Sequence, residues 1–255
     1  MKNVFAILAL TALAGAAQAD IVIDAVETGR FTIGQPGGGI AAVPNSIYSN
    51  VDTFSGQAYA IGGATNISGN TITRLFADDI ICAAHTAGPI TSFHFNVANL
   101  NTSVVSARAR VRFYADNGSN APGTYITGYT FNPISFTANS VTTYVATGIS
   151  IVDQGTNKFW AGITFDNNTG ATGATEAQLN NLGMGLFNPV DIGSSADTAF
   201  GTTAAGSFLV NSPAGANFNF NGTPNANFGW AFIPTPSSAA MLSLGGLMAA
   251  RRRRV

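Results

Sequence analysis

Residues 104–114 read VVSARARVRFY, a run in which charged and apolar side chains alternate. Side chains of an extended strand point in turn to opposite faces of a sheet. One face of this run therefore carries three arginines, Arg108, Arg110 and Arg112. The other face carries the apolar residues Ala109, Val111 and Phe113. The alternation predicts a long β-strand with one face in a core.

Other segments show the same two-residue period or a β-branched composition. Phe93, Phe95 and Val97 share one face of residues 89–97. Further strands are predicted at residues 20–26, 140–152, 157–165 and 227–233. Clusters of Gly, Asn, Pro and Ser separate these runs, and about a dozen short strands at such spacing are typical of a β-sandwich or jelly roll. We therefore predict one all-β domain over residues 20–233.

One short helix is predicted inside this β domain. Thr175 and Gln178 have the spacing of a capping box, and Leu179 and Leu182 lie three residues apart. Gly183 is the residue expected to end the helix.

The composition limits the classes of function. The 255 residues are 46% hydrophobic and only 9% charged, whereas an average soluble domain has about 25% charged residues. Without Lys2 and the four terminal arginines, six basic residues remain against twelve acidic ones, which argues against nucleic-acid binding. The single cysteine, Cys82, allows no internal disulfide, so core burial must hold the fold.

The arginine face and one tryptophan are the candidate binding features. Arg108, Arg110 and Arg112 could bind an anionic polysaccharide or a carboxylate partner. They could equally form a solvent-exposed stripe that pairs with acids on neighbouring strands, and we favour this second interpretation. Trp160 alternates away from Phe159 and Ile163, so we expect an exposed indole that could stack on a sugar ring.

Catalytic motifs are weak in this sequence. Cys82 and His85 have C-x-x-H spacing, but a cysteine nucleophile also needs an activated thiolate and an orienting group. A glycoside hydrolase would need two carboxyl groups facing a cleft, and the only crowded acids are Asp78, Asp79, Asp166 and Glu176. We therefore predict no catalytic residues and no enzyme activity.

Calcium is the one metal ion that the sequence leaves open. Asp166, Asn167 and Asn168 supply oxygen atoms in one short segment, and Asp78 with Asp79 forms another oxygen pair. An EF-hand loop starting at Asp166 would require Gly at position 171 and Glu at position 177, and both are Ala. Asp78, Asp79 and Asp166 are thus calcium candidates, and no other cofactor is predicted.

The N-terminus has the pattern of a secretory signal peptide. Lys2 supplies the positive charge, residues 4–16 are mostly apolar, and Ala17 and Ala19 form an A-x-A cleavage site before Asp20. The apolar run is shorter than the roughly 20 residues of a membrane span. Residues 1–19 are therefore predicted to be removed by signal peptidase.

The C-terminus carries three elements in order. Pro234, Thr235 and Pro236 come first, an apolar stretch follows at residues 239–250, and four arginines close the segment: Arg251, Arg252, Arg253 and Arg254. This order resembles the PEP-CTERM sorting signal, in which Glu stands at the position of Thr235. The resemblance covers residues 234–255. It implies recognition by an exosortase, a membrane enzyme, and delivery through the inner membrane of a Gram-negative-type bacterium to its surface or extracellular matrix.

The apolar stretch is also a poor permanent anchor. Twelve helical residues span about 18 Å, against a hydrocarbon core of about 30 Å. The terminal arginines favour the cytoplasmic side, which leaves the body outside. We therefore expect a transient membrane association through this helix.

Three body segments resemble uncharacterised exported β-sandwich proteins that carry this tail. They read ITRLFADDI (72–80), ARVRFYADNGSNAPGTYI (109–126) and WAGITFDNNTGATGA (160–174). The sequence thus predicts an exported structural or adhesive protein of the cell surface, matrix or biofilm, without catalysis, which could contact extracellular polysaccharide. A carbohydrate-binding module is the alternative, followed by a glycoside hydrolase or lyase.

Overall fold

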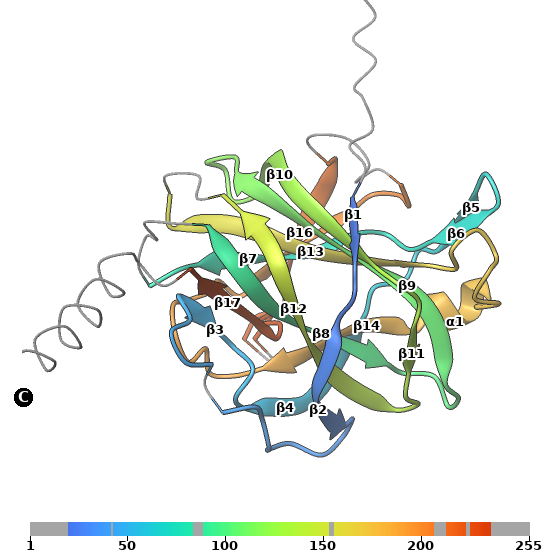
Figure 1. Ribbon diagram of the computed structural model, residues 1–255, viewed down its shortest axis with the longest axis horizontal. Helices are drawn as coiled ribbons and strands as arrows, with labels where there is room; N and C mark the ends of the chain where they lie inside the picture. Colours follow the sequence, from blue (N-terminus) through green and yellow to red (C-terminus); the bar gives the residue numbers. More distant parts are fainter. Residues whose placement is uncertain are drawn as a thin grey trace, which may run out of the picture.

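The computed structural model describes residues 20–41, 43–83, 89–152, 156–206, 213–222 and 225–235. These residues form two β-sheets that lie on each other as layers, and a single short helix among the described elements (Figure 1). The prediction of an all-β fold with two sheets is confirmed.

The first sheet follows the order β1-β10-β9-β13-β7-β15-β16, and β11, β5 and β6 pair at its sides. Its strands are β1 (Ile21–Ile23), β5 (Thr65–Ile67), β6 (Asn70–Ile72), β7 (Phe76–Ile81), β9 (Val105–Asp116), β10 (Pro122–Phe131), β11 (Ile134–Phe136), β13 (Lys158–Asp166), β15 (Thr198–Thr202) and β16 (Gly215–Asn219). Strand β1 runs parallel to β10, and the other pairings are antiparallel.

The second sheet follows the order β2-β12-β8-β14-β4, with β17 also pairing with β8 and with β3. Its strands are β2 (Val26–Thr32), β3 (Tyr48–Ser49), β4 (Phe54–Ala60), β8 (Ile90–Asn99), β12 (Ser140–Ile151), β14 (Leu182–Phe187) and β17 (Trp230–Pro234). Helix α1 (Glu176–Asn180) contacts β6 and β14.

Most predicted elements are found, with corrections at two boundaries. The single strand expected at residues 20–26 is wrong, because the chain leaves the first sheet after Ile23 and enters the second at Val26. The capping box between Thr175 and Gln178 is confirmed by two hydrogen bonds. The helix ends at Asn180 with Asn181 as its C-cap, and Gly183 does not end it, because Gly183 pairs with Ala60 in the sheet.

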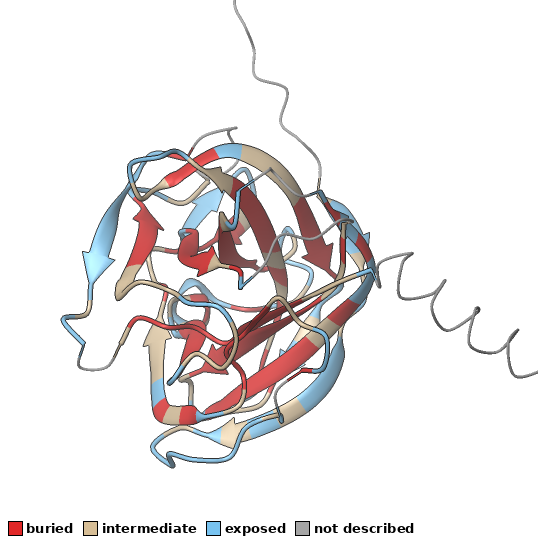
Figure 2. Cartoon of the chain, turned by 90° about the vertical axis from the view of Figure 1, so that its left-hand side faces the viewer, coloured by how far each residue is buried: buried red, intermediate tan, exposed pale blue. Residues whose placement is uncertain are grey.

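The main core fills the space between the two sheets. Strand β8 contributes Phe93, Phe95 and Val97, which are almost fully buried as their alternation predicts. Trp230 and Phe232 of β17 stack in the same cluster. Figure 2 shows the buried residues on strands that line the interior. Aromatic rings therefore supply much of the apolar surface that a disulfide-free fold must bury.

Buried asparagines join the strands where the second sheet forks. Strand β8 pairs with β17 through Phe95 and with β14 through Ala98, so the two partners separate at Asn96. The Asn96 amide donates to Gly229 O (3.0 Å), and its Oδ1 accepts from Gly185 N–H (2.5 Å). The side chain thus satisfies backbone groups that no strand reaches, as buried polar groups require.

Farther along the fork, Asn50 bridges β14 and the segment that leads into β17. Its Nδ2 donates to Phe187 O and to Phe228 O, both at 3.1 Å. These bonds hold the segment that leads into β17, in which the N–H of Phe228 donates to Asp78 of strand β7 in the first sheet.

Candidate functional site

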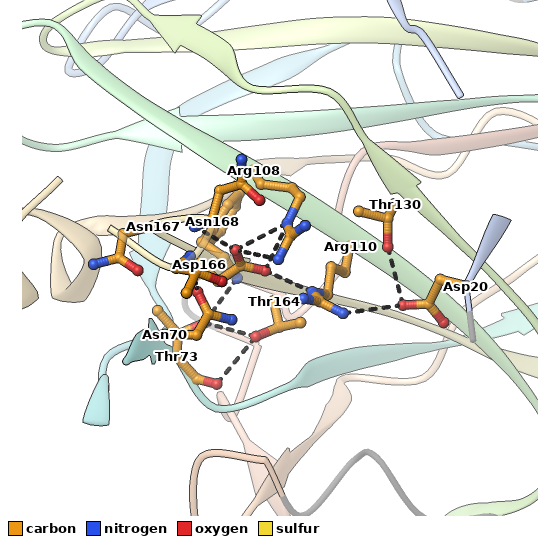
Figure 3. A network of polar contacts seen from close by, with 12 residues as sticks. Asp20, Asn70, Thr73, Arg108, Arg110, Thr130, Thr164, Asp166, Asn167 and Asn168 are labelled. Atoms are coloured by element: carbon orange, nitrogen blue, oxygen red, sulfur yellow. Dashed lines mark hydrogen bonds and ion pairs between the residues drawn. The ribbon is translucent and has the colours of Figure 1, made fainter. Parts of the chain in front are cut away.

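The arginine face of β9 lies on the outer side of the first sheet, and its charges are paired there. Asp166 of β13 stands opposite Arg108 in the strand register. Arg108 Nε and Nη2 donate to the Asp166 carboxylate at 2.9 to 3.1 Å, and Arg110 Nε donates to Oδ2 at 2.5 Å (Figure 3). The Asp166 side chain is fully buried, so two guanidinium groups compensate one carboxylate away from water.

Asp20 extends this pairing along the strand. Its carboxylate lies 2.8 Å from Arg112 Nη2 and 3.7 Å from Arg110 Nη1, and it accepts a hydrogen bond from Thr130 Oγ1. The Asp20 side chain is 1% exposed. We call the alternating set Arg108, Asp166, Arg110, Asp20 and Arg112 the charge ladder. Through Asp20, this ladder fixes the first described residue of the chain on the outer face.

The ladder changes the interpretation of its arginines. The expected pairing with acids on neighbouring strands is confirmed, since Asp166 of β13 binds Arg108 and Arg110. The expected solvent exposure is wrong, because the side chains of Arg108 and Arg110 are 20% and 18% exposed and that of Arg112 only 2%. Acids of the chain itself occupy the donors that an anionic ligand would need. In this geometry, the three arginines therefore serve to hold the folded sheet together.

The same contacts argue against calcium at Asp166. Two arginines already neutralise its carboxylate and would repel a cation. The neighbouring oxygen Asn167 Oδ1 accepts from Thr71 N–H and Gly170 N–H. Within the described ranges, no three His, Cys, Asp or Glu side chains are grouped so that they could hold a metal ion.

Trp160 is fully buried, so the prediction of an exposed stacking platform is wrong. It packs on the outer face of the first sheet in a second apolar cluster with Leu75, Tyr114 and Phe200. Its Nε1 donates to Asp116 Oδ1 at 2.8 Å. Alternation places Trp160 on the outer face correctly, but loops cover that face, and strand period alone does not reveal such a cover.

Asp78 and Asp79 are both fully buried on β7 and lie on opposite faces of the strand. Ser195 Oγ lies 3.0 Å from one carboxylate oxygen of each. Asp78 accepts from Phe228 N–H. Burial raises the pKa of Asp78 well above its ordinary value, and the neighbouring Asp79 raises it further. Burial therefore disfavours the ionised form of Asp78 in the folded chain.

The hydrolase candidates do not converge in a cleft. Asp78, Asp79 and Asp166 are inaccessible, and Glu176 is exposed on α1. Among the described residues, a groove of about 390 Å³ lies beside β4. Uncharged residues line it, including Gln57, Tyr59 and Phe220.

The groove follows the edge of the second sheet. Ile33 and Ala58 on one wall pack with the Phe54 cluster, whereas Tyr59 and Phe220 on the other wall pack with the main core. One face of Tyr59 stacks on Phe76, with ring centres 4.7 Å apart, and Phe220 meets Tyr59 edge-on. No local motif marked these residues, because 161 positions separate Tyr59 from Phe220 in the sequence.

Several predicted site residues lie outside the described residues. They are Ala17 and Ala19 of the signal cleavage site, His85 of the C-x-x-H pair, Pro236 of the sorting motif, and the terminal residues Arg251, Arg252, Arg253 and Arg254. Pro234 and Thr235 are described: Pro234 pairs with Ile90, and Thr235 N–H donates to Pro89 O at 3.0 Å. In the part of the chain that is described, no helix has the length and apolar content needed to cross a bilayer.

The chain matches no protein-family model, and neither a search of curated proteins nor a search of solved structures found a match. The sorting-signal resemblance of residues 234–255 therefore stays a prediction.

The charge ladder predicts that removing the Asp166 carboxylate strongly lowers the stability of the fold. Asp166→Asn leaves Arg108 and Arg110 without their buried anion, so the free energy of unfolding should fall by about 3 kcal/mol. Urea denaturation measures this change. The matched control is Glu27→Gln, which breaks an exposed pair with Arg30 and should cost less than about 1 kcal/mol. Equal costs for both variants would contradict the assigned role of the ladder.

Replacing Asp78 by a neutral residue should increase the stability of the fold by an amount that depends on pH. Its folded pKa is raised, so the wild type loses stability as the pH rises above the ordinary aspartate value of 3.8. Asp78→Asn removes this loss while keeping an acceptor and a similar shape. Urea denaturation should show the variant more stable than the wild type at pH 7, with a difference that shrinks toward pH 4. If the difference in unfolding free energy between variant and wild type does not vary with pH, then ionisation of Asp78 does not destabilise the folded state.

Proposed function

We propose that this chain is an exported structural or adhesive protein of the bacterial surface or extracellular matrix, sorted by an exosortase-like enzyme. The observation that carries the proposal is the position of the strands relative to the two predicted processing segments. Strand β1 begins at Ile21, two residues after Ala19, and β17 ends at Pro234, the first residue of the sorting motif. Cleavage after Ala19 and beyond Pro236 would therefore remove no strand of the described residues.

The contacts next to each predicted cut support the same proposal. Cleavage after Ala19 keeps Asp20, whose carboxylate completes the charge ladder with Arg110 and Arg112. Cleavage beyond Pro236 keeps Thr235, whose N–H and hydroxyl both donate to Pro89 O. The mature chain would therefore retain the bonds that fasten both of its ends.

A structural role also agrees with the use of charge in the body. Asp166 and Asp20 are bound to arginines of the same sheet, and Asp79 lies 3.4 Å from Lys158 Nζ. Charged groups that catalyse or bind must be accessible to a ligand, whereas these carboxylates are buried. These carboxylates are paired inside the fold and are not available to a ligand.

Carbohydrate binding is a second candidate, favoured by the groove beside β4. The partly exposed rings of Tyr59 and Phe220 could pack on a sugar, and Gln57 could hydrogen-bond its hydroxyl groups. The groove has no charged lining, which suits a neutral glycan. This site replaces Trp160 and the arginine stripe in the module interpretation.

The sorting proposal predicts a trimmed C-terminus. Mass spectrometry of the protein recovered from the surface of a bacterium with an exosortase should find a chain that ends near Pro236. Replacing Arg251, Arg252, Arg253 and Arg254 by Gln should abolish trimming and surface delivery, because the orienting charge is lost. Arg30→Gln, which changes one exposed arginine of the body, should be trimmed normally. A surface protein with an intact RRRRV end would contradict the proposal.

If the groove binds neutral glycans, a variant that lacks one of its rings should bind them more weakly. Tyr59→Ala removes a stacking ring and should lower affinity at least about tenfold on a glycan array, as expected for an interaction of about 1.4 kcal/mol. Val104→Ala, at an apolar residue that is 60% exposed and does not line the groove, is the matched control. Unchanged binding in Tyr59→Ala, or no glycan binding by the wild type, would remove this candidate and leave the structural role.

A further inference from the structure

Lys158 lies within reach of three groups that come from separate parts of the first sheet. Its Nζ is 2.5 Å from Asn120 Oδ1, 3.4 Å from Asp79 Oδ2 and 3.5 Å from Asp116 Oδ1. An amine, a side-chain carboxamide and two carboxylates thus meet at one point. We call Lys158, Asn120 and Asp79 the lysine cluster.

The turn between β9 and β10 holds the carboxamide over the amine. Asn117 Oδ1 accepts from Ser119 N–H and Ala121 N–H, which fixes the turn. Asn120 adopts a left-handed backbone with φ of 56°, a conformation that asparagine tolerates better than most residues. Its backbone oxygen accepts from Asn217 Nδ2 of β16 at 2.8 Å. Contacts from two directions therefore position Asn120.

Asp79 is the second, independent observation at this cluster. Its side chain is fully buried, and one oxygen, Oδ1, accepts from Ala196 N–H. The other oxygen, Oδ2, accepts no hydrogen bond from the described residues and is directed at Lys158 Nζ. A buried carboxylate with a free oxygen beside an amine is placed to exchange a proton with it.

The surroundings of Lys158 also suit a reacting amine. Its Nζ lies 5.4 Å from the centre of the buried Trp160 ring, so part of its hydration is replaced by an apolar surface. The side chain remains 25% exposed. A small leaving group formed at Asn120 can therefore reach the solvent.

We propose that Lys158 and Asn120 form an intramolecular isopeptide bond, with Asp79 as the proton acceptor. Asp79 takes one proton from the Lys158 ammonium, and the neutral Nζ attacks Cγ of Asn120. The Nζ–Cγ bond forms and the Cγ–Nδ2 bond breaks. A second proton of Nζ passes to Nδ2, which leaves as ammonia, while Asp79 keeps the first proton. Charges balance, because a lysine cation and an aspartate anion become a neutral amide and a neutral carboxyl.

This step removes a buried charge that is expensive to keep. The Asp79 side chain is fully buried, and only Lys158 compensates its charge among the ion pairs of the described residues. After the reaction, the neutral Asp79 carboxyl can hydrogen-bond the new amide. Asp116 keeps its hydrogen bonds from Trp160 Nε1 and Gly118 N–H.

The bond would supply the covalent staple that the sequence otherwise lacks. With one cysteine, the chain has no internal disulfide. A link between Asn120 and Lys158 would close a loop across 38 positions and join the β9–β10 turn to β13. Closing such a loop restricts the unfolded chain, as a disulfide does. The inference goes beyond the proposed function and does not depend on export.

Peptide mapping of the full chain tests the proposal. Purified folded protein should yield one branched peptide that contains Asn120 and Lys158 and is lighter than its two parts by one ammonia molecule. Trypsin should not cut after Lys158, because its amine is acylated. Recovery of the two unmodified peptides in full from folded wild-type protein would overturn the proposal and leave an ordinary hydrogen bond and ion pair.

Three variants test separately the amine, the carboxamide and the proton acceptor that the bond requires. Lys158→Arg keeps the cation and Asn120→Ala removes the electrophile, so neither should form the branched peptide. Asp79→Asn keeps the shape of the carboxyl group but cannot accept the proton, so linked peptide should fall at least tenfold in protein that melts cooperatively. Glu176→Gln, at an exposed carboxyl on α1, should be linked like the wild type. Undiminished linkage in folded Asp79→Asn would exclude Asp79 as the proton acceptor.

Discussion

The pairing of the buried Asp166 carboxylate with Arg108 and Arg110 is the constraint on which the first sheet depends. A carboxylate without water must be compensated, and the strand register of β9 against β13 brings both guanidinium groups to it. A shift of one residue in the pairing of β9 with β13 would turn the arginines toward the core. The charge ladder therefore fixes the register, and through Asp20 it also fixes the start of the chain.

Neutral amides perform the corresponding task in the second sheet. Asn96 and Asn50 bond to the backbone of β14 and to the segment that leads into β17, where these strands diverge from β8. An amide donates and accepts at once, so it can replace a missing strand without bringing in a charge. This is a physical reason why a protein with 9% charged residues can be rich in asparagine.

The internal use of charge leaves a largely neutral surface for function. The groove beside β4 is uncharged, and three of the four carboxylates that suggested catalysis or calcium binding, those of Asp78, Asp79 and Asp166, are buried. Such a body suits a component that contacts other macromolecules through shape and neutral groups. The lysine cluster adds a means of stapling the fold that needs neither a second cysteine nor a metal ion.

The sequence by itself determined the all-β class, several of the long strands, and which residues of those strands share a face. Alternation is a local property of the backbone, so Phe93, Phe95 and the arginines of β9 could be assigned to faces without a structure. The capping box of Thr175 was local for the same reason. What covers each face was decided only by the tertiary structure. Trp160 is buried in a cluster with Leu75 and Phe200. Asp166 meets Arg108 across 58 positions, and Asn120 reaches Lys158 across 38. Such contacts depend on how distant strands pair, and no short-range pattern encodes that pairing.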